Sequence, residues 1–176
     1  MSFLELAKKR YSVRDFKPNV VEQEKLQTIL EAGRVAPTAA NRQPQRLVVI
    51  QRQEGLAKVS KAAKIFGAPL VILVCAERET VWVRPFDGKL TLDIDASIVT
   101  DHMMLQATEL GLGSVWVCHF NTDILKSELN LPGTWEPVNI LAIGYANGNA
   151  ASPDRHQTTR KQLSETVFFE STQSVK

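Results

Sequence analysis

Residues 93–110 constrain the fold most, because they predict a long helix that is apolar on two sides. At the helical period its apolar side chains fall into two stripes. The first stripe contains Ala96, Val99, Met103, Ala107 and Leu110, and the second contains Ile94, Ile98 and Leu105. One small sheet cannot cover both stripes, so the helix is either buried all round or packed on its own core and on a partner subunit.

The remaining pattern alternates short apolar runs with amphipathic segments. Strands are predicted over residues 46–51, 69–76, 114–120 and 138–145, and further helices over residues 3–10, 22–35, 54–64 and 122–129. Ser2 and Thr122 are the expected N-caps. Residues 146–161 are predicted to be polar and irregular before the apolar Leu163, Val167, Phe168 and Phe169. The chain is therefore predicted to be one α+β domain over residues 1–176. A small mixed or antiparallel sheet is covered by helices, and residues 146–176 form a C-terminal arm.

Charge and cysteine usage favour a cytoplasmic protein without metal, nucleic acid or membrane. The formal net charge is only +2, and no apolar run reaches the roughly 20 residues that a bilayer requires. No basic segment followed by an apolar stretch suggests a signal peptide at the start. Cys75 and Cys118 both lie in apolar runs and are expected to be buried, reduced thiols, in no metal-binding spacing.

The first candidate site is the extended segment that follows the first helix. Extended backbone places Arg10, Ser12 and Arg14 on one face, and Tyr11 and Val13 on the other. Arg10 also continues the expected buried stripe of the first helix, where a charge needs a partner. Two guanidinium groups beside a hydroxyl suit a phosphate. The alternative is a pair of surface arginines that bridge Asp15 and Glu5.

Three further segments are candidates, each with an ordinary structural alternative. The loop over residues 37–45 can offer amides and a hydroxyl to a planar polar ring through Thr38, Asn41 and Gln43, or simply connect a helix to a strand. The strand after the Gly111 to Gly113 turn can present its backbone to a ligand, with His119 as a donor or as a structural histidine. Arg160 and Lys161 can close a phosphate site from the far end of the chain, or form a solvated basic turn.

In order and spacing these segments resemble the nitroreductase family of flavoproteins. The matching residues are Arg10, Ser12 and Arg14; Pro37, Thr38, Asn41, Gln43 and Pro44; Asp95, Gly111, Gly113 and Trp116; Ala142, Gly144 and Tyr145; and Arg160. The resemblance covers nearly the whole chain. It implies a homodimer in which the C-terminal arm embraces the other subunit, and in which the Asn41 loop reaches the flavin of the other chain.

The resemblance also implies flavin mononucleotide (FMN) as the cofactor and NADH or NADPH as the co-substrate. Its expected flavin-binding residues are Arg10, Tyr11, Ser12, Arg14, Pro37, Thr38, Asn41, Gln43, Trp116, Val117, Cys118, His119, Arg160 and Lys161. Hydride passes to the flavin and then, by a ping-pong mechanism, to a small acceptor such as a nitroaromatic or a quinone, so no side chain is required as a catalytic residue.

Two other functions stay open at this point. One is a flavoenzyme of the same family with another reaction, such as reductive dehalogenation or flavin breakdown. The other is a non-catalytic nucleotide- or RNA-binding module, which the near-neutral charge and the lack of interleaved aromatic residues disfavour.

Overall fold

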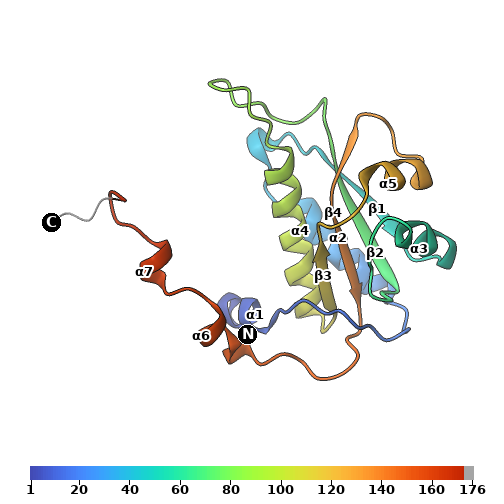
Figure 1. Ribbon diagram of the computed structural model, residues 1–176, viewed down its shortest axis with the longest axis horizontal. Helices are drawn as coiled ribbons and strands as arrows, with labels where there is room; N and C mark the ends of the chain where they lie inside the picture. Colours follow the sequence, from blue (N-terminus) through green and yellow to red (C-terminus); the bar gives the residue numbers. More distant parts are fainter. Residues whose placement is uncertain (173–176) are drawn as a thin grey trace.

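A four-stranded antiparallel sheet forms the centre of the molecule, in the order β1-β2-β4-β3 (Figure 1). The strands are β1 Gln45–Ile50, β2 Leu70–Glu77, β3 Gly113–Val117 and β4 Trp135–Gly144. The computed structural model describes residues 1–172. Strand β2 lies between two neighbours and is buried over residues 70–76, which is why its sequence is continuously apolar instead of alternating.

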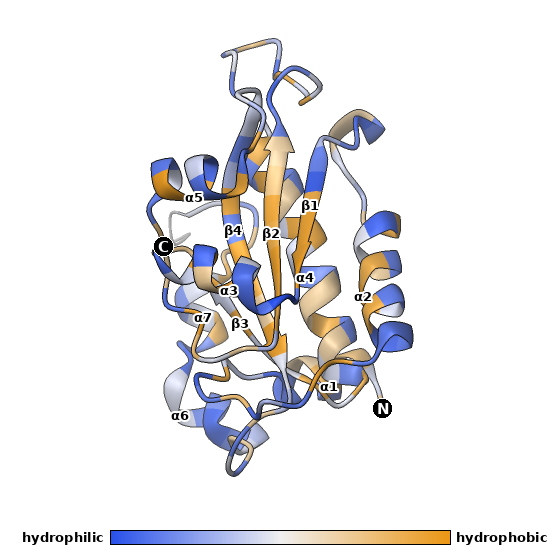
Figure 2. Cartoon of the chain, turned by 90° about the vertical axis from the view of Figure 1, so that its right-hand side faces the viewer, coloured by the Kyte–Doolittle hydropathy of each residue, from blue (hydrophilic) through white to orange (hydrophobic). Residues whose placement is uncertain are grey.

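Helices cover both faces of this sheet (Figure 2). The helices of the described residues are α1 Phe3–Lys9, α2 Gln23–Val35, α3 Gln53–Ser60, α4 Leu92–Glu109, α5 Thr122–Leu129, α6 His156–Thr159 and α7 Leu163–Thr166, with 3-10 turns at Ala39–Asn41 and Pro153–Arg155, and α6 and α7 lie away from the sheet. Alternate residues of β2 enter separate cores: Ile72 packs with α2 and α4, and Leu73 packs with α3 and α5. The predicted α+β architecture is confirmed, and the sheet is antiparallel.

Helix α4 has the two unequal faces that its sequence predicts. The side chains of Ala96, Val99, Met103 and Ala107 are fully buried against the sheet and α2. The second stripe points outward: Ile94 is 48% exposed, and Ile98 and Leu105 are half-buried. One face therefore belongs to the core of this chain, and the other remains partly open.

Local signals at the helix ends are right at α1 and wrong at α5. Ser2 caps α1 in a capping box with Glu5, as predicted. The prediction of Thr122 as the cap of α5 is wrong, because the Asn121 side chain accepts the hydrogen bond from the Ile124 amide. Helix α1 also has no buried residue, so Arg10 does not continue a buried stripe.

The third predicted strand, over residues 114–120, is shorter in the structure than in the sequence prediction. Strand β3 ends at Val117, because Phe120 pairs with Ala63 in an isolated bridge instead of continuing along β4. Cys118 is consequently exposed, contrary to prediction, whereas Cys75 is buried. Burial raises the pKa of the Cys75 thiol to about 12.

The C-terminal segment passes below the ends of the strands to α1 and then runs away from the body of the molecule (Figure 1). The predicted irregular stretch over residues 146–161 contains a 3-10 turn and α6, so it is irregular only in part. The apolar side chains that follow this stretch are exposed: Leu163 is 77% exposed and Phe169 is 86% exposed. The final four residues of the predicted arm lie outside the described residues. Within residues 1–172, we find no helix with the length and apolarity needed to cross a bilayer.

Candidate functional site

The extended segment after α1 lies beside the start of β3, at the C-terminal end of α4. Ser12 pairs with Ser114 in a parallel bridge, and the Val13 amide donates to the Ser114 carbonyl oxygen over 2.9 Å. A glycine is needed at position 113, since a Cβ there would lie 2.6 Å from Val13 Cγ2. Gly111 adopts a left-handed φ of 78° in the preceding turn, as the sequence predicts. The two glycines thus position the segment against the sheet.

Arg155 fastens the C-terminal linker to this end of the molecule. Its guanidinium donates to the carbonyl oxygens of Lys8, over 3.1 Å, and of Arg10, which are at the end of α1. A third bond goes to the Ser152 carbonyl oxygen over 2.8 Å. Arg155 therefore occupies the unpaired carbonyls of α1 and holds residues 146–160 next to Arg10. The sequence analysis did not select Arg155, because nothing in its neighbourhood shows a partner 145 residues away.

Three arginines lie near one another where Arg155 attaches the linker to the end of α1, a contact that we call the clasp. Burial, followed by the nearby positive charges of Arg155 and Arg160, lowers the pKa of the Arg10 guanidinium, and Asp101 acts in the opposite direction. Arg160 is therefore brought to Arg10 from the far end of the chain. Among residues 1–172, no carboxylate lies within ion-pair distance of these arginines. The cluster is therefore a cationic site without an ion pair among residues 1–172, and Asp101 compensates the charge of Arg10 only in part.

The alternative that Arg10 and Arg14 bridge surface acids is wrong. The Glu5 carboxylate accepts from the Ser2 amide, and the Asp15 carboxylate accepts from Asn147 Nδ2 over 3.0 Å. Arg14 is exposed, as are Lys161 and Arg160. Beside Ser12, the Ser114 hydroxyl is 98% buried and has no hydrogen-bond partner within the described chain. The cationic site thus retains donors for an anion.

The loop with Thr38, Asn41 and Gln43 is held in an unusual backbone conformation. Ala40, Asn41 and Gln43 have left-handed φ values of 49°, 52° and 50°. The Thr38 hydroxyl accepts from the Gln43 amide over 3.1 Å, so its oxygen helps to close the loop. Pro37 precedes this turn and is exposed.

A buried carboxylate fixes the loop to the first turn of α4. Asp95 Oδ1 accepts from the Ala39 amide over 2.8 Å, and Oδ2 accepts from the Thr91 hydroxyl over 2.9 Å. Asp95 has no exposed surface. The sequence analysis noted Asp95 but gave it no role. An acidic residue in the first turn, next to the buried stripe of α4, was the available signal.

The two sets of candidate residues therefore lie at opposite ends of α4 (Figure 1). This helix has 18 residues and is about 27 Å long. Arg10, Ser12 and Arg160 meet at its C-terminal end, and the Asn41 loop is bonded to its N-terminal end. Trp116 and Val117 lie in β3, and Cys118 and His119 are exposed just beyond it. A single chain does not bring the complete predicted set together.

Each set suits one part of the flavin that the resemblance implies. The uncompensated arginines and the orphaned Ser114 hydroxyl fit a phosphate, which accepts several charge-assisted hydrogen bonds at once. The Asn41 loop has exposed amide side chains, which fit the polar edge of a planar ring. The residues of one chain therefore fit the phosphate and the ring of FMN separately, at the two ends of α4.

Comparison with known proteins identifies the family to which the chain is similar. The model of the family described as "Nitroreductase family" matches residues 7–65 and 57–145. A crystal structure of a nitroreductase family protein from Clostridium difficile 630 has 60% identity and a TM-score of 0.96, over 97% of this chain and 99% of the other. An FMN-dependent nitroreductase from C. difficile R20291 has 27% identity and a TM-score of 0.79, over 96% and 99%. The FMN reductase [NAD(P)H] of Bacillus subtilis is 28% identical, over 82% of this chain and 66% of its own length.

Proposed function

The chain belongs to the nitroreductase family, and we propose that it is a homodimeric oxidoreductase that uses FMN to transfer hydride from NADH or NADPH to a small nitroaromatic or quinone-like acceptor. The observation that carries this proposal is the cluster of Arg10, Arg155 and Arg160, in which no carboxylate of residues 1–172 forms an ion pair. FMN and NAD(P)H are named for the B. subtilis relative, and FMN for the C. difficile R20291 structure.

When bound, the flavin supplies the redox chemistry by accepting and passing on a hydride. The chain supplies position and charge. Arg10 and Arg160 would hold the phosphate with Ser12, and Arg14 or Arg10 would supply positive charge to the ring, which would favour its reduction. Trp116 to His119 line the ring, and the exposed Cys118 and His119 shape the space for the acceptor without reacting.

A dimer follows from the separation of the two ligand sets. One chain holds its phosphate-binding arginines and its Asn41 loop at opposite ends of α4. A two-fold axis that pairs two α4 helices in opposite directions brings the arginines of one chain to the loop of the other. Each of two equivalent sites then receives both sets, which supports a shared site at the interface.

Exposed apolar surface supports the same arrangement. A groove between α1, α2 and α4 is lined by apolar side chains that include Phe3, Val35 and Leu105. The arm carries Leu163, Phe168 and Phe169, each of which stabilises an interface by roughly 1.5–3 kcal/mol when it is buried. We propose that these side chains pack on the partner subunit.

Ligand discrimination tests the cofactor assignment. Apoprotein is titrated with FMN, with riboflavin, which lacks the phosphate, and with flavin adenine dinucleotide. FMN should bind tightest and riboflavin at least about tenfold more weakly, because it loses the charged hydrogen bonds. Equal affinity for FMN and riboflavin would remove the role of the arginine cluster.

Steady-state turnover tests the reaction separately. NADH and NADPH are each paired with nitroaromatics, quinones and free flavins, and parallel double-reciprocal plots are expected for one shared substrate space. Intersecting plots would exclude the ping-pong order. A protein that holds FMN but oxidises neither nicotinamide would leave only the cofactor assignment standing.

A further inference from the structure

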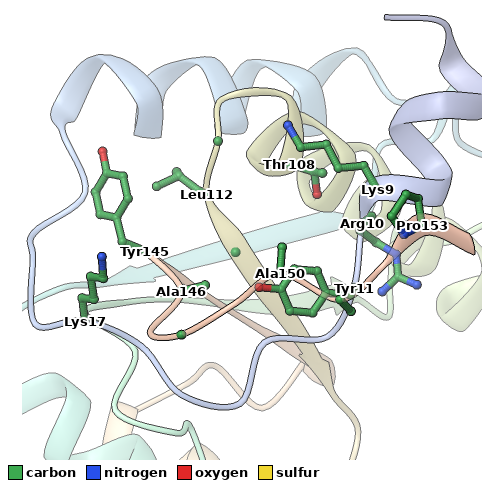
Figure 3. A pocket seen from close by; sticks show the side chains of 14 residues that line it. Lys9, Arg10, Tyr11, Lys17, Thr108, Leu112, Tyr145, Ala146, Ala150 and Pro153 are labelled. Atoms are coloured by element: carbon green, nitrogen blue, oxygen red, sulfur yellow. The ribbon is translucent and has the colours of Figure 1, made fainter. Parts of the chain in front are cut away.

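A second cavity lies behind the extended segment, on the face opposite Ser12 and Arg14. It has a volume of about 340 Å³ and is bordered by Tyr11, Leu112, Tyr145 and the linker over residues 146–153 (Figure 3). Arg10 and Tyr11 line this cavity, whereas Ser12, which pairs with Ser114 through the backbone, and Arg14 are not part of its lining. Of the proposed phosphate ligands, only Arg10 reaches its rim. The cavity therefore adjoins the proposed flavin site: it shares Arg10 and Tyr11 with the predicted flavin-binding residues, but not Ser12, Arg14, Arg160 or the residues from Trp116 to His119.

The outer wall of the cavity is fixed at both ends. At one end, Asn147 donates its backbone amide to the Asp15 carbonyl oxygen, over 2.9 Å, and its Nδ2 to the Asp15 carboxylate. At the other end, Arg155 donates to the carbonyl oxygens of Lys8 and Arg10. The linker between these points is held against the body of the protein, so the cavity is preformed.

The polar groups around the cavity are almost all donors without acceptors. Lys9 and Lys17 lie on opposite sides of it (Figure 3). Neither ammonium group has a hydrogen bond or ion pair with any residue in the range 1–172, and the same holds for the Tyr11 hydroxyl. The Tyr145 hydroxyl is different, since it is engaged by Glu22 and Lys25 and leaves only its ring to the wall. The described lining contains no aspartate or glutamate.

We propose that this cavity binds a small organic anion, with an acidic head and a compact apolar or aromatic body. The head is held by Lys17, which lies next to Tyr145, and the body packs on Leu112 and the Tyr145 ring, while Lys9 adds positive charge from the opposite side (Figure 3). An apolar cavity of this size with a few convergent polar groups is typical of small-molecule sites. A carboxylate and a phosphate monoester share the required chemistry.

Benzoate is the probe that tests this assignment, with benzyl alcohol and acetate as matched ligands that lack the charge and the ring. Binding is followed by amide chemical shifts in nuclear magnetic resonance spectra of the flavin-loaded and the flavin-free protein. Benzoate should shift the amides of Gly111, Gly113 and Gly148 in both forms, and each control ligand should bind at least about tenfold more weakly. Shifts confined to Trp116 through His119, or benzyl alcohol binding as tightly as benzoate, would overturn the proposal.

Two pairs of variants locate the site. Ala150 lines the cavity and is exposed, so Ala150→Trp should fill the cavity and abolish the shifts while the fold is retained. Asn149→Trp, one residue earlier and outside the cavity lining, is its control. Lys17→Met should weaken benzoate binding roughly three- to fivefold, and Lys8→Met should leave it unchanged. Unaltered benzoate binding in Ala150→Trp would refute the site. Flavin retention, read from absorbance in every variant, keeps this result separate from the fate of the proposed flavin site.

Discussion

The two ends of α4 are built on opposite electrostatic principles. At the N-terminal end, the charge of Asp95 is completely buried and both carboxylate oxygens are occupied by donors from this chain. At the C-terminal end, Arg10, Arg155 and Arg160 approach one another without a carboxylate in ion-pair contact within the described chain. The first end is a completed structural site that shapes a loop. The second end has no such pairing among residues 1–172, so it differs from the first in having cationic groups that are open to an external anion.

Removal of residues 163–176 should have the largest effect, because it tests whether the two ends act together. If the arm holds two chains in register, the truncated protein should lose both the dimer and the flavin. Light scattering with simultaneous flavin absorbance measures both quantities. A truncated monomer that still carries flavin would show that one chain completes the site alone.

Neutralising the cationic end should weaken flavin binding without affecting the fold. Arg14→Ala and Arg160→Ala each remove a charged hydrogen bond worth about 1.5–3 kcal/mol, so a roughly 10- to 100-fold higher dissociation constant is expected. Titration of the apo variants with FMN measures it. Arg52→Ala, an exposed arginine at the start of α3, is the control. Wild-type affinity in both site variants would contradict the assignment.

Substitution at the completed end should instead affect stability first. Asp95→Ala leaves the Ala39 amide and the Thr91 hydroxyl without their acceptor, at a cost of about 1–3 kcal/mol in the free energy of unfolding. Urea denaturation measures this cost. Asp95→Asn keeps an acceptor for the Ala39 amide and should lose less. If the alanine variant is as stable as the wild-type protein, the carboxylate does not anchor the loop.

The smallest effect is expected from the thiols. Cys75 has a pKa of about 12 because it is buried, so it should remain protonated and unreactive toward alkylation at pH 8, while the exposed Cys118 reacts. Mass spectrometry of native protein should show one label per chain, slowed when FMN is added. Cys118→Ser should retain most turnover. A flavin-loaded Cys118→Ser protein without turnover would make the thiol a chemical participant.

Sequence periodicity was sufficient for most of the fold because local apolar patterns determine the helices and strands. The two faces of α4 and the buried run of β2 were both predicted in this way. The errors concern features set by distant contacts. Strand β3 was overextended because the bridge between Phe120 and Ala63 has no local signal, and Cys118 was therefore wrongly expected to be buried.

The candidate site shows the same division. Alternation correctly separated Val13, which is buried, from Arg14, which is exposed. The partners that organise the site were not visible, because Arg155 binds carbonyls at the other end of the chain and Asp95 binds an amide 56 residues away. Every residue has a backbone carbonyl, and every residue except proline has a backbone amide. The residue that supplies the backbone partner of such a hydrogen bond can therefore be of almost any type, and no sequence motif marks it.

The clasp between α1 and the linker joins two segments that are far apart in the sequence. Arg155 and Arg160 follow Arg10 by 145 and 150 positions. The strands β1 to β4 and helix α4 all lie between them, so the clasp closes a loop that contains the whole sheet. The arginine cluster is thus complete only after residue 160 has been added, when every strand of the sheet has already been synthesised.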